Sequence, residues 1–225
     1  MTDTFSEKTL SYLIELRARN DREWYQEHKP DYERYVLRPF QALVRALAPA
    51  IARIDPMIET QPATGKTISR VYRDSRFSKD KSLYRDRVWI TFEQKNAGYP
   101  DVPAFYFELT PSGYSYGAGF YYVSPKTMGE YRAMIDRDEA GFLDTIKPVM
   151  DAGVFTVEGD EYKRGRYTGA NPEIARWYNR KNIYVTAGDG DVTGAFEFDA
   201  LTALLISGFS ALAGIYHFWR EAASR

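Results

Sequence analysis

The chain has 225 residues, 44% of them hydrophobic and 27% charged, and this composition indicates a folded globular protein rather than a disordered one. It contains no cysteine, which excludes disulfides, thiolate catalysis and cysteine-based zinc sites. Its net charge of −1 creates no overall attraction to nucleic acid or to a membrane, so electrostatic recognition has to come from local clusters.

Helices are predicted for the N-terminal quarter of the chain. Ser6 is a candidate N-cap for a helix over about 7–18, and Asp21 can cap a short helix that follows it. Pro30 fits the first turn of the next, longer helix. Pro39 lies inside that helix and should bend or split it, because proline lacks the backbone N–H that the helix uses.

An antiparallel sheet is predicted for the middle of the chain. Its first three strands are Val88–Phe92, Ala104–Thr110 and Tyr114–Phe120, and a Pro-Ser-Gly turn joins the second to the third as a hairpin. Alternation along the strands places aliphatic and aromatic side chains on one face and Arg, Glu, Tyr and Thr on the other. This polar face has the composition of a binding surface, and equally that of an ordinary solvated face.

The next elements are shorter. Helices are expected after Ser124-Pro125, over Glu139–Met150 and over Pro172–Asn179, with short strands at Val154–Val157 and Ile183–Thr186.

The last predicted helix is strongly apolar. From Leu201 to Phe218 it has no formal charge over 18 residues, which is near the lower limit for a membrane span. Thr, Ser, Gly and His interrupt the run, so a buried core helix capped by Asp199 is the better interpretation. Its buried stripe is expected to contain Leu201, Leu204, Leu205, Leu212, Ile215, Tyr216 and Trp219.

This order of elements predicts an α+β fold in one domain over residues 1–225. A central antiparallel sheet carries helices mainly on one face, with helices at both ends of the chain. The start, MTDTFSEKTL, lacks the basic and apolar regions of a signal peptide. We therefore expect a soluble cytoplasmic protein that does not associate with membranes.

A basic segment, Arg70–Arg87, stands out in this neutral chain. It holds seven basic and three acidic residues, a local balance of +4. Arginine offers a planar fork of donors that matches phosphate or carboxylate, and lysine adds a mobile point charge. The segment therefore predicts a site for an anionic ligand, either a small molecule or a nucleic acid, with the candidate residues Arg70, Arg73, Asp74, Arg76, Lys79, Asp80, Lys81, Tyr84, Arg85 and Arg87.

Two other interpretations of this segment stay open. Interleaved Arg and Asp can form a structural salt-bridge lattice, and the protein would then be a non-enzymatic interaction module. Glu93-Gln94-Lys95 with Asp86 upstream also resembles, more weakly, the acidic-plus-lysine sites of metal-dependent nucleases. The sequence identifies neither a catalytic residue nor a cofactor. It also predicts no metal site, because His28 and His217 lie far apart in the sequence.

A second basic segment interleaves arginine with tyrosine. Tyr162–Tyr167 reads YKRGRY, and Arg180-Lys181-Asn182 follows a short predicted helix. Proteins use this pattern on single-stranded nucleic acid through charge and stacking. A solvated loop is the default interpretation of so short a pattern.

The residues of the basic segment also carry a family resemblance. The run Arg70-x-x-Arg73-Asp74-x-Arg76-Phe77-Ser78-x-Asp80-Lys81-x-x-Tyr84 resembles the hallmark of a family of unknown function found in bacteria and fungi. The N-terminal Leu13, Leu16, Asn20 and Trp24, the glycines before Tyr122 and the second basic segment are similar to the family's other motifs. The resemblance covers almost the whole chain and implies no settled activity, cofactor or catalytic residue.

One position departs from the family pattern. The later family motif contains Asp-His-Pro before its short helix, where this chain has Ala170-Asn171-Pro172. Acid–base chemistry by a histidine at this position therefore does not apply here.

Overall fold

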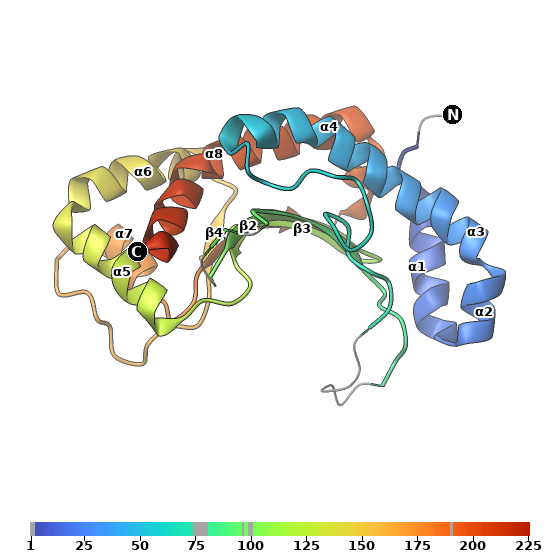
Figure 1. Ribbon diagram of the computed structural model, residues 1–225, viewed down its shortest axis with the longest axis horizontal. Helices are drawn as coiled ribbons and strands as arrows, with labels where there is room; N and C mark the ends of the chain where they lie inside the picture. The colour runs from blue at the N-terminus through green and yellow to red at the C-terminus, as the bar shows by residue number, and fades with distance from the viewer. Residues whose placement is uncertain (1–2, 74–80, 96, 99–100, 190) are drawn as a thin grey trace. The chain divides into compact units, whose positions relative to one another are not determined.

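A computed structural model of the chain describes residues 3–73, 81–95, 97–98, 101–189 and 191–225 (Figure 1). The five strands form one antiparallel sheet in the order β1-β2-β3-β5-β4, and helices lie at both ends of the chain. The α+β fold class predicted from the sequence is confirmed.

The chain folds into two compact units that interleave in sequence. The first unit contains Met1–Phe92, Tyr106–Ser115 and Gly188–Ile206, and the second contains Glu93–Phe105, Tyr116–Ala187 and Ser207–Arg225.

The helices of the first unit begin close to the predicted positions. They are α1 (Glu7–Arg19), α2 (Arg22–Glu27), α3 (Lys29–Tyr32), a π-helical turn (Glu33–Leu37) and α4 (Arg38–Ile54). Ser6 is the N-cap of α1, and the Asp21 carboxylate caps α2 by accepting the Trp24 N–H at 2.8 Å.

The break expected at Pro39 takes the form of the π-helical turn just before it. Pro39 lacks the N–H that would bond to the carbonyl of Tyr35 in a regular helix. That carbonyl accepts instead from the Thr9 hydroxyl of α1, at 2.7 Å. The carbonyl that lacks its helical partner is therefore hydrogen-bonded by a side chain of another helix.

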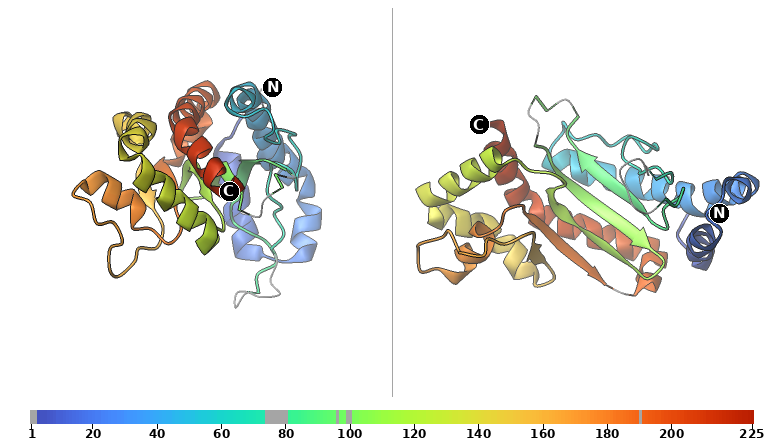
Figure 2. Two further views of the ribbon diagram at one scale, coloured as in Figure 1. Left: turned by 60° about the vertical axis from the view of Figure 1, so that its left-hand side comes forward. Right: turned by 90° about the horizontal axis from the view of Figure 1, so that it is seen from below.

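Strand alternation appears as the sequence predicts. The strands are β1 (Val88–Glu93), β2 (Pro103–Thr110), β3 (Gly113–Phe120), β4 (Thr156–Glu158) and β5 (Tyr184–Asp189), which Figure 2 shows face-on from below. In β1 and β2, buried residues alternate with partly exposed ones along the whole strand. One face of these strands is thus core, and the other carries polar groups.

Aromatic rings fill the core of the first unit. Phe5 packs edge-on against Phe40 of α4 with ring centres 4.9 Å apart, and both rings contact Phe107 of β2. All three side chains are at most 1% exposed. The apolar faces of α4 and β2 are therefore joined through ring packing, which adds to the effect of burial.

In the second unit, helices α5 (Pro125–Arg137), α6 (Glu139–Ala152) and α7 (Pro172–Tyr178) accompany part of α8 (Phe198–Ser224). Phe105 of β2 packs on Phe209 and Tyr216 of α8, with ring centres 5.3 Å and 4.8 Å apart. The predicted stripe of α8 is buried except for Leu204, which is 37% exposed. Asp199 lies in the first turn of α8 and is not its cap.

The length and apolar composition of α8 alone would allow it to cross a membrane. No other helix in the described ranges passes that test. In the structure, one stripe of α8 is buried by contacts such as those with Phe105, which is the arrangement of a core helix.

Four buried tyrosines form a cluster in the first unit. Tyr25 stacks on Tyr84 with ring centres 4.6 Å apart, and Tyr12 and Tyr32 extend the cluster. Burial raises the pKa of Tyr25 to about 12. Burial also raises the pKa of Tyr12, Tyr32 and Tyr84 well above the ordinary value of tyrosine.

This cluster predicts that the protein loses stability in alkali. Above about pH 10, tyrosines of the unfolded chain ionise while those of the cluster keep their protons, so stability falls as the pH rises. Chemical denaturation should give a lower free energy of unfolding at about pH 11 than at about pH 9, with a smaller difference in Tyr12→Phe. Equal pH sensitivity in wild type and variant would contradict this account.

Candidate functional site

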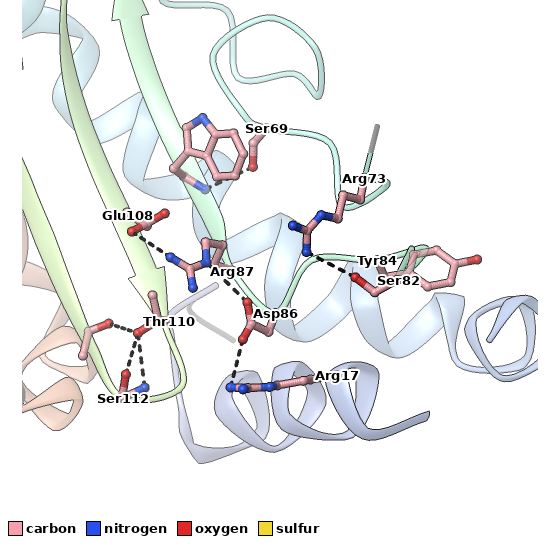
Figure 3. A network of polar contacts seen from close by, with 12 residues as sticks. Arg17, Ser69, Arg73, Ser82, Tyr84, Asp86, Arg87, Glu108, Thr110 and Ser112 are labelled. Atoms are coloured by element: carbon pink, nitrogen blue, oxygen red, sulfur yellow. Dashed lines mark hydrogen bonds and ion pairs between the residues drawn. The ribbon is translucent and has the colours of Figure 1, made fainter. Parts of the chain in front are cut away.

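An extra segment covers the free edge of β1. Residues 67–69 run beside this strand, and the Ser69 N–H donates to the Trp89 carbonyl at 2.9 Å. The Thr91 N–H donates to the Thr67 carbonyl at 2.8 Å. The Ser69 hydroxyl accepts the Trp89 N–H at 3.1 Å (Figure 3). The backbone groups at the edge are thereby paired, as a sheet edge requires.

The same pairing continues to the base of the loop that bears the family hallmark. Tyr72 and Tyr84 lie opposite each other as an antiparallel bridge, and the Arg73 N–H donates to the Leu83 carbonyl at 2.8 Å. The Tyr84 ring is 2% exposed and packs on Tyr72 and Tyr25. Residues 72–73 and 83–84 therefore form a paired base, here called the loop base, that the buried Tyr84 ring fixes to the core.

Asn20 holds this base from the other side. Its amide oxygen accepts the N–H groups of Leu83 and Tyr84, at 2.6 Å and 3.1 Å, and its amide nitrogen donates to the Tyr84 carbonyl at 3.0 Å. Asn20 ends α1 in the left-handed conformation, with φ 45°. Asparagine suits this position because it tolerates left-handed backbone and still offers a donor and an acceptor.

Beside this base lies an open groove of about 460 Å³, here called the arginine groove. Its described lining comes from the covering segment, the loop base and β1, and consists of Gly65, Ser69, Arg70, Tyr72, Arg73, Arg85 and Trp89. Three of these side chains are guanidinium groups, and none is a carboxylate. The described lining of the groove is therefore positively charged, with two aromatic rings beside the charges.

The guanidinium groups of the groove differ in how they are held. Arg85 donates to the carbonyls of Arg70 and Tyr72, at 2.9 Å and 3.0 Å, and lies 4.8 Å from the ring centre of Trp89. Arg73 donates to the Ser82 hydroxyl at 3.2 Å. Arg70 is exposed and lies close to Gly65, whose φ of 77° favours glycine. Arg85 is thus fixed by the backbone, whereas the Arg70 side chain faces solvent.

The predicted site residues fall into separate groups. Arg70, Arg73 and Arg85 line the arginine groove together. Tyr84 lies in the core, and Lys81 is exposed beside the loop base. Asp74, Arg76, Lys79 and Asp80 lie outside the described residues.

Arg87 belongs to a network outside the groove (Figure 3). It lies 3.3 Å from Asp86 and 3.7 Å from Glu108, and Asp86 also contacts Arg17 of α1 at 3.2 Å. This network joins α1, the start of β1 and β2, as a structural salt-bridge lattice would. Because Arg17 and Arg87 are well exposed, each pair contributes at most about 1 kcal/mol.

Sequence reasoning did not single out Gly65, Ser69, Tyr72 and Trp89 as groove residues. The alternation along β1 places Trp89 on the partly exposed face of that strand, so one signal for it is present in the sequence. Nothing in the sequence indicated that residues 65–69 would return to the edge of β1, because that contact depends on the path of a connecting loop.

The matching family model is described as "Conserved hypothetical protein (DUF2461)" and covers residues 8–218. The chain belongs to the DUF2461 family. The match runs from α1 to α8 and includes the arginine groove and both basic segments. No curated protein matches the chain. Membership in DUF2461 confirms the expected family of unknown function and brings no activity with it.

The Asn20 contacts generate a stability prediction. Asn20→Gly keeps the left-handed backbone accessible but removes three hydrogen bonds, so we expect a loss of about 1–3 kcal/mol. Asn20→Ala removes the same bonds and also strains the left-handed conformation, so it should lose about 1 kcal/mol more. Urea denaturation measures the free energy of unfolding of both variants. A glycine variant as stable as wild type would contradict the role given to the Asn20 side chain.

Proposed function

We propose that the arginine groove binds an anionic ligand through its phosphate or carboxylate groups. The observation that carries this proposal is the convergence of Arg70, Arg73 and Arg85 on one groove with no carboxylate in its described lining. A small molecule and a nucleic acid are the two sources of such anionic groups.

The geometry supports binding in two ways. Arg85 is already oriented by two carbonyls, so little side-chain entropy is lost when an anion arrives. Ser69 adds a hydroxyl, and Tyr72 and Trp89 add ring surfaces that exclude water from one side of the ligand. A guanidinium that meets an oxyanion in such surroundings forms stronger hydrogen bonds than neutral groups do.

A fluorine reporter on the groove tests the proposal. Incorporation of 5-fluorotryptophan labels Trp89, and loss of one resonance in Trp89→Phe assigns its signal. Pyrophosphate should shift this signal, and the shift should weaken as the salt concentration rises. Joint replacement R70Q and R73Q should reduce the affinity by about tenfold or more, because two charge-assisted contacts are lost.

A matched control removes two cations that lie outside the groove. The R17Q and R87Q pair changes the charge of the same unit by the same amount and acts on the ion-pair network instead. It should leave the affinity within about twofold of wild type. The proposal fails if pyrophosphate leaves the Trp89 signal unchanged, or if both double variants weaken binding equally.

A non-enzymatic interaction module with a structural lattice is the second candidate. The network of Arg17, Asp86, Arg87 and Glu108 favours it, since these residues join three elements. Under this alternative, joint replacement R70Q and R73Q would lower the melting temperature strongly and would leave the affinity for pyrophosphate unchanged. In the described ranges, no three His, Asp or Glu side chains gather as metal ligands, so nothing there adds support to a metal-dependent nuclease.

A further inference from the structure

The second unit contains a cluster of cations around a single ring. The guanidinium of Arg166 lies 3.8 Å from the ring centre of Tyr162, that of Arg132 lies 5.3 Å away, and the ammonium of Lys181 lies 5.8 Å away. These four residues are here called the Tyr162 cluster. They come from three separate stretches of the chain, so the fold rather than the local sequence brings them together.

Within the described residues, no carboxylate pairs with the cations of the Tyr162 cluster. The neighbouring ion pairs join Arg176 to Glu173 and Arg180 to Glu161 instead. Asp136 accepts a hydrogen bond from the Tyr178 hydroxyl at 2.9 Å. The ring attracts each cation, but the cations repel one another, and this repulsion is relieved when an anion binds.

Arg132 is the buried member of the cluster, with 7% of its surface exposed. It donates to the carbonyls of Tyr178 at 3.1 Å and Met128 at 2.9 Å, and also to that of Arg180. Each of its three side-chain nitrogens thus donates one hydrogen bond, which fixes the guanidinium in place, but carbonyl dipoles leave its full charge in place. Arg132 therefore acts as a fixed positive charge beneath the exposed Arg166 and Lys181.

The backbone that carries the exposed cations is also fixed. The Asn179 side chain accepts the N–H groups of Arg166 and Tyr167, at 2.6 Å and 3.0 Å. The Lys181 N–H donates to the Asp160 carbonyl at 2.6 Å. These hydrogen bonds hold the backbone of Arg166 and Lys181 in place. Less entropy is therefore lost when both side chains contact one ligand.

From this geometry we infer that the Tyr162 cluster is a second anion site, distinct from the arginine groove, which takes a phosphate group. Arg166 supplies the planar fork of donors, Lys181 supplies a mobile ammonium, and Arg132 adds the buried charge. Exposed Lys163 and Arg164 lie in the same loop and add to the positive field around the site. A phosphate monoester and the phosphodiester of a single-stranded nucleic acid present this same chemistry.

Binding is tested in the R70Q and R73Q background, so that the arginine groove does not contribute. The probes are inorganic phosphate, followed by calorimetry, and a fluorescein-labelled oligothymidylate, followed by fluorescence anisotropy. Adding R166Q and K181Q should weaken binding of the responsive probe by about tenfold or more and reduce its salt dependence. K181Q alone should give a smaller loss in the same direction.

The matched control adds K147Q and R176Q to the same background. These replacements also remove two cations from the second unit, but both side chains are exposed and belong to other ion pairs. The control should leave binding within about twofold. Thermal melts followed by circular dichroism check that the variants are folded. If the double replacement destabilises the protein, the binding of K181Q alone is compared with the control instead.

The two probes separate the sources of phosphate. Binding of inorganic phosphate without the oligonucleotide identifies a site for small phosphorylated molecules, and tight binding of the oligonucleotide identifies a single-strand site. The inference is overturned if neither probe binds in the R70Q and R73Q background. It is also overturned if R166Q and K181Q weaken binding no more than K147Q and R176Q do.

Discussion

The pairing of residues 67–73 with residues 83–91 is the constraint on which the candidate site depends. Backbone hydrogen bonds between Ser69 and Trp89, and between Arg73 and Leu83, bring two stretches of the basic segment side by side. Without this pairing, Arg70 and Arg85 would be separated by a long loop. Asn20 and the buried Tyr84 ring fix the end of the pairing, so the position of the groove is set by the core.

Arginine has two different uses in this protein. Arg17 and Arg87 form exposed ion pairs with Asp86 that join elements, whereas Arg70, Arg73 and Arg85 converge on a groove with no described carboxylate. In the second unit, Arg132 is fixed by carbonyls and Arg166 stacks on Tyr162. The contacts of each guanidinium, rather than the number of basic residues, therefore distinguish the ion-pair network from the groove proposed as an anion site.

Local signals in the sequence predicted the elements well. Alternation in β1 and β2, the caps at Ser6 and Asp21 and the hairpin all appear in the structure, because short-range sterics and hydrogen bonding determine them. The lining of the arginine groove was predictable in part: the local charge of the basic segment pointed to Arg70, Arg73 and Arg85. The division between groove and ion-pair network was not predictable, because it depends on Glu108 and Arg17, which are distant in sequence.

The most direct test of the account is a crystal structure of the protein grown with pyrophosphate. The account predicts ordered density in the arginine groove, with phosphate oxygens at about 2.8 Å from the guanidinium nitrogens of Arg70 and Arg73. The account would be contradicted if, in crystals grown with excess pyrophosphate, the groove contained only water and Arg70 and Arg73 paired with carboxylates of the chain.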